Sequence, residues 1–317
     1  MEVYKYLFWT LFLFSFVTYF VQHLICAYFY KTQNLKRRYN AQWALVTGAS
    51  SGIGKSIAFK LARQGLNVVL VALGDPLLDA THDELVQAFD KQEFRKVPAN
   101  LGGDDYLESI KAATDDIPVQ IVFCNAGYLL TGFFFARSLG DLMANHNCNA
   151  TSAVQITHHF VSKMLTAKLK GCFVYTSSAA AAAPSPFSVL YAATKSFLAS
   201  FGAGLAAELG PYGIDVLVFF PSPVASRFYD KAHKIDALEF FKKFAVSAEE
   251  LPDTVFASIG RTVFRDVGPT GVGFRLAMKI IDYNFLAYLT ASIASFMPDY
   301  KRQKVEADAA LARNYAR

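Results

Sequence analysis

Two residues four positions apart, Tyr191 and Lys195, share one face if they lie on a helix. A lysine ammonium beside a phenol favours the phenolate, so we expect Lys195 to lower the pKa of Tyr191 from about 10 toward neutrality. Such a tyrosine can give a proton to a ketone oxygen or take one from an alcohol. Ser178 follows a predicted strand, and its hydroxyl can stabilise charge on the same oxygen. Tyr-x-x-x-Lys also occurs on ordinary solvated helices, so the other motifs must decide whether this pair is catalytic.

A glycine-rich turn follows the first predicted strand, Trp43–Thr47, and leads into a helix-like segment. The backbone N–H groups of such a turn and of the helix N-terminus can receive a pyrophosphate. The glycine spacing is a variant of the general dinucleotide fingerprint. The candidate cofactor-binding residues here are Gly48, Ser50, Ser51, Gly52, Ile53 and Gly54.

Two further polar positions follow in the same chain order. Asn125, Ala126 and Gly127 come after a fourth predicted strand, and Asn149 precedes Ser178. A glycine turn alone is only a tight connection, but chance is a poor account of this ordered set. Parallel strands place their carboxyl ends at one edge, so we expect these motifs to converge on one cleft.

Together these motifs resemble the short-chain dehydrogenase/reductase family over residues 42–228. The resemblance implies a cofactor turn at 47–54, a fourth-strand motif at 125–127 and a nicotinamide-contacting loop at 221–226. In that loop Pro221, Val224 and Ser226 are the candidate contacts, and Ser222 stands where a glycine is usual. The implied catalytic tetrad consists of Asn149, Ser178, Tyr191 and Lys195.

The resemblance also implies a role for each member of the tetrad. Tyr191 protonates the ketone oxygen, and Ser178 holds that oxygen. Lys195 tunes Tyr191 and also binds the nicotinamide ribose, whereas Asn149 supports a proton-relay water. The expected activity is hydride transfer from a nicotinamide cofactor to a ketone.

The adenosine end of the cofactor site lacks the residues that usually choose the cofactor. An acidic residue after the second strand favours NAD, and an arginine there favours NADP. Here Ala72, Leu73 and Asn100 occupy the discriminating positions, while Asp75 could reach a ribose hydroxyl. Lys55, early in the phosphate-binding helix, favours a phosphate, although its simpler interpretation is a solvent-facing residue. The resemblance favours NADP(H), and NAD(H) is not excluded.

The N-terminal segment 7–30 contains no Asp, Glu, Lys or Arg and is long enough to span a bilayer. A cleaved signal peptide is the rival interpretation, but no small-x-small cleavage site follows the segment. Lys31 and the cluster at 36–38 place the following domain in the cytosol by the positive-inside rule. We therefore expect a single-pass anchor in the endoplasmic reticulum membrane.

With this anchor, the chain resembles the membrane-bound branch of the family. That branch holds very-long-chain 3-oxoacyl-CoA reductases, 17-beta-hydroxysteroid dehydrogenases and 3-ketodihydrosphingosine reductases. The implied substrate is a ketone on a long-chain lipid, with 3-oxoacyl-CoA first and 3-ketosphinganine or a steroid as alternatives. A homodimer is a further expectation. The alternative of another class is a binding or structural subunit that keeps the fold without the chemistry.

Composition supports membrane contact and disfavours several other classes of protein. The chain has 317 residues, 53% of them hydrophobic, and a mean hydropathy of +0.26. Its net charge of +5 comes without a basic, aromatic stripe, so we expect no nucleic-acid partner. The four cysteines and six histidines show no metal-ligand spacing, so we expect no metal site.

Short apolar runs alternate with helical stretches, which predicts an α/β fold with a Rossmann-type, doubly wound parallel sheet. The predicted strands are 43–47, 67–72, 94–99, 121–125, 172–177 and 215–220. The predicted domains are an anchor and basic linker (1–40), a catalytic domain (41–265) and an amphipathic C-terminal extension (266–317).

Five other segments carry weaker signals. Ala179–Ala183 predicts a small-residue wall of the substrate pocket, with a mere helical turn as the alternative. Phe133–Phe135 would line an acyl channel or, more simply, pack in the core. Segment 224–250 fits a lid over the substrate, and segment 274–297 fits a helix lying in the membrane interface. The tail 301–317 is expected to be an exposed charged helix or a disordered end.

Overall fold

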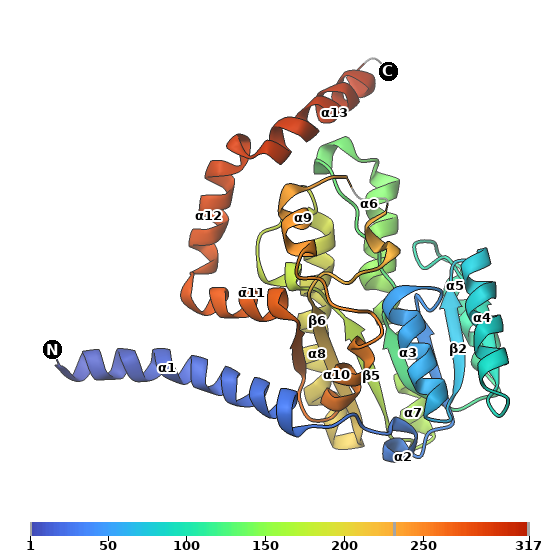
Figure 1. Cartoon of the computed structure of the whole chain (residues 1–317). Coiled ribbons are helices and arrows are strands. Elements are labelled where there is room, and N and C mark those ends of the chain that lie inside the picture. The colour runs from blue at the N-terminus through green and yellow to red at the C-terminus, as the bar shows by residue number, and fades with distance from the viewer. Residues whose placement is uncertain (1, 231–232, 316–317) are drawn as a thin grey trace.

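A seven-stranded parallel sheet forms the centre of the computed structural model, which describes residues 2–230 and 233–315 (Figure 1). Its order is β3-β2-β1-β4-β5-β6-β7, so the chain winds to one side of β1 and then to the other, which confirms the doubly wound fold. The strands are β1 Trp43–Thr47, β2 Asn67–Ala72, β3 Phe94–Pro98, β4 Val119–Cys124, β5 Gly171–Thr176, β6 Ile214–Pro221 and β7 Phe264–Val267.

The six predicted strands are present, with ends shifted by no more than two residues, but β7 is an addition that the sequence does not predict. Two of its four residues are Arg265 and Asp266, which is typical of a polar loop rather than a buried strand. In the structure both are only 6% exposed. Asp266 pairs with Arg275 at 3.2 Å, and this partner makes the buried charge tolerable at the sheet edge.

Helices cover both faces of the sheet. One face packs against α2 Leu35–Tyr39, α3 Gly52–Arg63, α4 Pro76–Ala88 and α10 Leu251–Ser258. The other face packs against α5 Tyr106–Thr114, α7 Ser152–Thr166 and α8 Val189–Leu209. Because both faces are covered, the central strands carry nearly continuous apolar runs, as parallel strands do.

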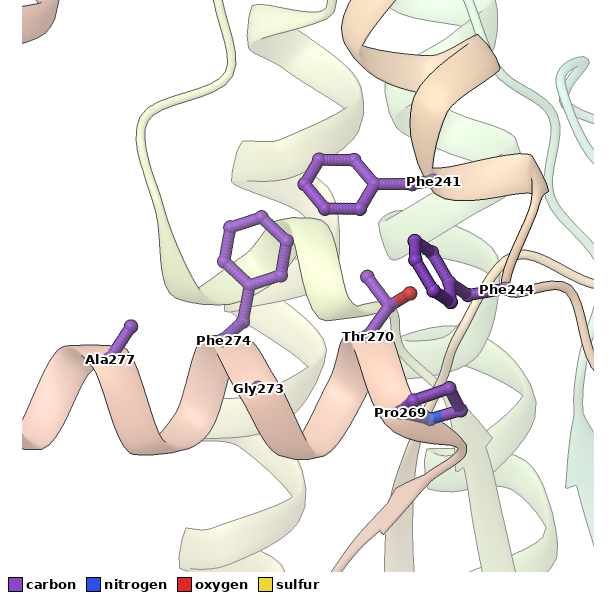
Figure 2. Close-up of a pocket in the computed structure, with 7 residues that line it drawn as sticks. All are labelled: Phe241, Phe244, Pro269, Thr270, Gly273, Phe274 and Ala277. Atoms are coloured by element: carbon purple, nitrogen blue, oxygen red, sulfur yellow. The ribbon is translucent and has the colours of Figure 1, made fainter.

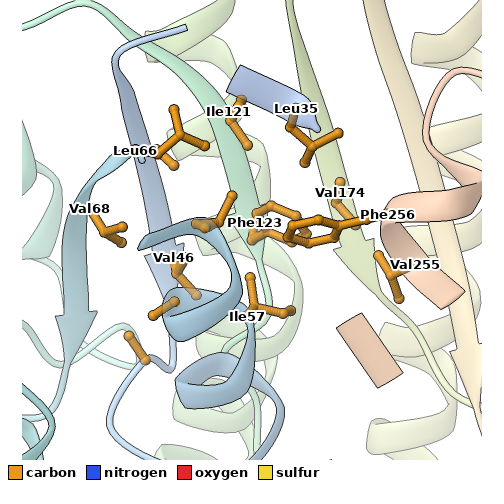
Figure 3. Packing of buried hydrophobic residues seen from close by; sticks show 14 of the residues in the cluster. Leu35, Val46, Ile57, Leu66, Val68, Ile121, Phe123, Val174, Val255 and Phe256 are labelled. Atoms are coloured by element: carbon orange, nitrogen blue, oxygen red, sulfur yellow. The ribbon is translucent and has the colours of Figure 1, made fainter. Parts of the chain in front are cut away.

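Buried apolar side chains pack between the sheet and the first of these two helical layers (Figure 3). Phe123 of β4 meets Phe256 of α10 with ring centroids 5.7 Å apart, and Ile57 of α3 lies in the same cluster. All three side chains are fully buried. This packing fixes the carboxyl ends of the strands, where the candidate site lies.

The remaining elements are short turns and terminal helices. They are η1 Ile25–Phe29, η2 Phe134–Ala136, α6 Leu139–His146, η3 Asn147–Thr151, η4 Ala179–Ala182, η5 Gly210–Tyr212, η6 Arg227–Tyr229, α9 Asp236–Lys242, α11 Pro269–Ile280, α12 Tyr283–Ile293, η7 Ala294–Phe296 and α13 Pro298–Tyr315. Helix α9 lies in the predicted lid, of which residues 231 and 232 are outside the described part of the chain.

The N-terminal apolar segment forms helix α1, Glu2–Leu24, which continues into the π-helical turn η1. Within the described residues, two helices are long and apolar enough to cross a membrane: Glu2–Phe29 and Val189–Tyr212. The second is core helix α8 with η5, and it packs on the sheet through Leu198 and Leu209.

Helix α1 is also attached to the sheet domain through polar side chains. The hydroxyl of Tyr19 donates a hydrogen bond to Asp266 of β7 at 3.1 Å. Lys279 of α11 donates to the hydroxyl of Ser15 at 2.9 Å. Ser15 and Tyr19 are four residues apart, so one face of α1 contacts β7 and α11. Much of the remaining surface of α1 consists of exposed apolar side chains.

The C-terminal apolar segment forms two helices where the sequence predicts one. Helix α11 ends at Ile280, and Asp282 begins α12, because its carboxylate accepts a hydrogen bond from the backbone N–H of Phe285 at 2.9 Å. Helix α12 exposes several large apolar side chains, namely Tyr283, Phe285, Tyr288, Leu289 and Ile293. The tail is helical in α13 as far as Tyr315, and residues 316 and 317 lie outside the described range.

The aromatic run 133–135 favours packing over an acyl channel. The ring of Phe133 lies 5.4 Å from that of Phe187 and 5.1 Å from that of Tyr300 on α13. Phe134 and Phe135 are each about half exposed. The run therefore holds α13 against the domain.

Candidate active site

The glycine turn after β1 folds tightly onto itself. Gly48 and Gly52 have positive φ angles of 65° and 52°, a region that favours glycine. A Cβ on Gly54 would lie 2.1 Å from the carbonyl oxygen of Gly48, so no side chain fits there. Helix α3 begins at Gly52, and its N-cap Ser51 makes no side-chain capping bond. The first-turn N–H groups are thus available, and the turn fits the phosphates of a dinucleotide.

The loop after β6 faces this turn. A Cβ on Gly52 would lie 3.2 Å from the Cβ of Ser226. The hydroxyl of Ser226 donates to the carbonyl of Val224, which pairs with Val246 in an isolated bridge. Pro221 ends β6 itself. The predicted cofactor residues Gly52 and Ser226 of the two loops therefore lie opposite each other.

At the predicted adenosine end the polar groups already have partners. Asp75 is the N-cap of α4 and accepts hydrogen bonds from the N–H groups of Leu77 and Leu78, at 3.1 and 3.2 Å. Lys55 pairs with Glu84 at 2.7 Å.

The three discriminating positions bring no charge to this end. Ala72 is buried at the end of β2. The side chain of Leu73 is exposed. Asn100 is also exposed and accepts a hydrogen bond from the N–H of Gly102 at 3.1 Å.

Asn125 connects three strand ends. Its side-chain amide donates to the carbonyl of Thr47 at 3.1 Å, and its oxygen accepts from the hydroxyl of Thr176 at 3.0 Å. The hydroxyl of Thr47 accepts from the N–H groups of Asn125 and Ala126, both at 2.9 Å. β1, β4 and β5 are thus tied together beside the glycine turn.

Asn149 and Lys195 converge on Gly127. A Cβ there would lie 3.0 Å from Oδ1 of Asn149 and 3.2 Å from Nζ of Lys195, so a side chain at this position would press against both groups. Asn149 lies in the π-helical turn η3, a feature frequent at functional sites. Its oxygen accepts from the N–H of Tyr128 at 2.9 Å, and its amide donates to the carbonyl of Tyr128 at 3.1 Å.

Tyr191 is 9% exposed near the start of α8. Its ring lies 5.9 Å from that of Phe228 in the loop after β6. Burial raises the pKa of Tyr191 well above its usual value, and neighbouring Tyr229 adds to the rise, while a hydrogen bond with Ser178 partly opposes it. Ser178 and Tyr191 are therefore in contact at their polar atoms, as two groups serving one oxygen must be.

Lys195 is 3% exposed, and its Nζ donates to the carbonyl oxygen of Thr176 at 2.8 Å. Burial lowers the pKa of Lys195 to about 8. Nζ lies 5.6 Å from the ring centre of Tyr191, which agrees with the shared helix face. The prediction that Lys195 lowers the pKa of Tyr191 toward neutrality is wrong for this structure, because burial of the phenol outweighs every favourable contact.

Several residues that shape this site carry no signal in the sequence. Thr176 positions both Asn125 and Lys195, and Tyr128 holds Asn149 through backbone atoms. Backbone partners have no side-chain signature. Only the position of Thr176, directly before the Ser177–Ser178 pair at a strand end, offers a clue.

The fold and site define a class of protein: an enzyme-like Rossmann domain with a dinucleotide cradle beside buried Tyr191, Lys195 and Asn149 and half-buried Ser178. The family model for the short chain dehydrogenase matches residues 42–235. The chain therefore belongs to the short-chain dehydrogenase/reductase family of nicotinamide-dependent oxidoreductases.

Known proteins support this assignment. The chain is 32% identical over 210 residues to 17-beta-hydroxysteroid dehydrogenase type 3 of Mus musculus, covering 65% of this chain and 68% of the mouse protein. It is 28% identical over 276 residues to very-long-chain 3-oxoacyl-CoA reductase of Podospora anserina, covering 82% and 81%. A short-chain dehydrogenase from Sphingobium yanoikuyae, solved in complex with NADPH, shares the fold at 24% identity with a TM-score of 0.65, covering 81% of this chain and 96% of that one.

The buried ammonium of Lys195 predicts a pH-dependent stability. The folded-state pKa is about 8, whereas an unfolded chain keeps a lysine pKa of about 10.4. Between these values the unfolded chain binds the extra proton, so the free energy of unfolding rises with pH through this group, by about 3 kcal/mol in all. In urea unfolding from neutral to alkaline pH, we expect wild type to gain that amount relative to Lys195→Met. A stability difference that stays level across the range would contradict the assignment.

Proposed function

We propose that this protein is a membrane-anchored reductase that converts a lipid ketone to an alcohol with NADPH. The observation that carries the proposal is the convergence of Ser178, Tyr191 and Lys195 at the carboxyl end of β5, beside a cradle that excludes a side chain at Gly54 and leaves little room for one at Gly127. A structural subunit would not need a buried lysine beside a buried tyrosine, which is costly to fold.

The chemistry follows from the protonation states of the side chains. When bound, the nicotinamide cofactor supplies the hydride that reduces the carbonyl carbon. Tyr191 stays protonated across the physiological range because its pKa is raised, so it is poised to give its proton to the carbonyl oxygen. Ser178, which contacts Tyr191, donates a hydrogen bond to the same oxygen and stabilises its developing charge.

The other two members of the set act from behind Tyr191. Lys195 holds a buried positive charge near the tyrosine ring, and this charge favours transfer of the phenolic proton. Asn149 is fixed by both backbone groups of Tyr128 and orients the water through which Tyr191 regains a proton. Both residues also reach Gly127, the wall of the cofactor cradle.

A long-chain 3-oxoacyl-CoA is the first candidate substrate. The support is the apolar helix Glu2–Phe29, the exposed apolar face of α12 and the similarity to a very-long-chain 3-oxoacyl-CoA reductase over most of both chains. A steroid ketone is the second candidate, supported by the similarity to 17-beta-hydroxysteroid dehydrogenase type 3. A comparison of kcat/KM for a long-chain 3-oxoacyl-CoA, 3-ketosphinganine and a steroid ketone separates these candidates.

The first test of this function is Tyr191→Phe. General acid catalysis contributes about 10²–10⁴-fold, so turnover with any accepted ketone should fall at least about a hundredfold while NADPH binding is kept. Tyr212→Phe is the matched control, because Tyr212 is exposed in η5 at the far end of the same helical segment. Near-normal turnover in Tyr191→Phe would overturn the assignment of the acid, and a wild type inactive on all ketones would favour the non-catalytic alternative.

Cofactor preference provides the second test. An arginine at Leu73 would offer a charged partner to the 2′-phosphate, so Leu73→Arg should tighten NADPH by about 1.5–3 kcal/mol and leave NADH nearly unchanged. Val86→Arg is the control for added charge, because Val86 is exposed on α4, which begins after Leu73. Steady-state titration with both cofactors measures the effect.

A preference for NADH would be tested with a variant of Asp75. Asp75→Asn removes the carboxylate charge while keeping an N-cap for α4. If wild type prefers NADH, and Asp75→Asn loses that preference, the acidic residue decides the cofactor and the NADPH proposal is wrong.

We also propose that α1 and η1 anchor the protein in the endoplasmic reticulum membrane with the sheet domain in the cytosol. The support is the basic segment that follows, with Lys31 and residues 36–38. Protease added outside sealed microsomes should digest the sheet domain. Deletion of residues 1–30 should weaken membrane association without abolishing it, because α12 keeps exposed apolar side chains. Full protection of the domain in intact microsomes would reverse the orientation.

A further inference from the structure

A cavity of about 320 Å³ lies between α9 and α11, outside the tetrad (Figure 2). Its walls are almost entirely apolar, formed by Phe241, Phe244, Phe274, Gly273 and Ala277, with Thr270 as the polar exception. The rings of Phe241 and Phe244, from the lid segment, lie across the cavity from Gly273 and Ala277 on α11. Such a space is suited to a hydrocarbon rather than to a charged group.

The hydroxyl of Thr270 is a second observation that points to a ligand. Thr270 is 8% exposed, and within the described part of the chain its Oγ1 has no hydrogen-bond partner. Figure 2 shows this oxygen on the cavity side, toward Phe244. A buried hydroxyl without a partner costs free energy, and an oxygen on a ligand would remove that cost.

The Thr270 end of the cavity is joined to the elements of the active site. The hydroxyl of Ser222, in the loop after β6, accepts hydrogen bonds from the N–H groups of Thr270 and Gly271, at 2.9 and 3.2 Å. Helix α11 also packs against η4, the turn directly after Ser178.

The other end of the cavity points away from the tetrad. Ala277 lies seven residues after Thr270, about 10 Å farther along α11, toward α12 and its exposed apolar side chains. The cavity therefore has a polar end joined to Ser222, in the loop after β6, and an apolar end toward the proposed membrane side.

We propose that this cavity holds the hydrocarbon chain of the substrate, with an oxygen at the head of the chain on Thr270 and the tail along Gly273 and Ala277. The inference rests on the proposed ketone reduction and specifies its substrate class: a flexible long-chain lipid, such as a 3-oxoacyl thioester, whose alkyl chain begins at the reacting ketone. The chain enters from the bilayer along α12, so substrate passes to Tyr191 without leaving an apolar environment.

Gly273→Phe tests the proposal because the position is open. A Cβ on Gly273 would meet nothing within 4 Å, so a phenyl ring can fill the cavity without disturbing the backbone. Gly204→Phe is the matched control: Gly204 is also helical, is exposed on α8 and has no neighbour within 4 Å of a built Cβ.

In wild type, KM for a series of 3-oxoacyl-CoA thioesters should fall roughly fourfold for each methylene that the cavity buries. Gly273→Phe should lose this dependence on chain length, whereas Gly204→Phe should keep both the dependence and the wild-type kcat. An unaltered chain-length dependence in Gly273→Phe would overturn the tail site, even if Tyr191→Phe abolishes turnover.

A binding measurement separates this inference from the proposed reaction. Titration with cis-parinaric acid, a fluorescent fatty acid, needs no turnover. The affinity of Gly273→Phe for this probe should be at least about tenfold lower than that of wild type. Thr270→Val removes the hydroxyl at constant shape; it should weaken the same probe several-fold and raise the melting temperature of the free protein. Wild-type affinity in both variants refutes the cavity as a lipid site, whereas a wild type that binds the probe but reduces no ketone refutes only the reaction.

Discussion

The hydrogen bonds around Asn125 are the constraint on which the site depends. They join the ends of β1, β4 and β5 through Thr47 and Thr176. The glycine turn follows β1, and Gly127 follows β4. The carbonyl of Thr176, which accepts the hydrogen bond from Lys195, lies at the end of β5. A parallel sheet supplies the common edge, but strands alone would leave these loops free to move. The side-chain brace makes them one rigid surface, which is what a hydride-transfer geometry requires.

Burial then decides the acid–base character of this surface. The same low-polarity environment raises the pKa of Tyr191 and lowers that of Lys195, so each group is pushed toward its neutral form. A neutral phenol is the form needed to protonate a ketone. The cost is a lysine whose charge is poorly solvated, held by a single carbonyl bond to Thr176. Burying these two ionisable groups lowers the stability of the fold, and such perturbed groups are typical of functional sites.

The C-terminal extension belongs to the site rather than to its periphery. Ser222 takes the place of a usual glycine in the family, and its hydroxyl caps the first turn of α11. That bond fastens the loop beside the cofactor cradle to a helix whose other side contacts α1 through Lys279. Helices α1 and α11 and the loop after β6 are therefore connected by direct hydrogen bonds. Such continuity is a reason for the C-terminal helices to be present in a protein whose substrate is proposed to come from a bilayer.

The sequence by itself determined the doubly wound sheet, because buried parallel strands are apolar runs and glycine turns have a local signature. It also determined which side chains belong together, since the four-residue spacing of Tyr191 and Lys195 survives in any helix. Only the tertiary structure decided the direction of the pKa of Tyr191, because burial depends on what packs around the phenol. It alone revealed β7, where Arg275 of α11 neutralises the buried carboxylate of Asp266, and the separate start of α12 at Asp282. The cavity beside Thr270 likewise depends on two helices far apart in sequence, and no local pattern records such a contact.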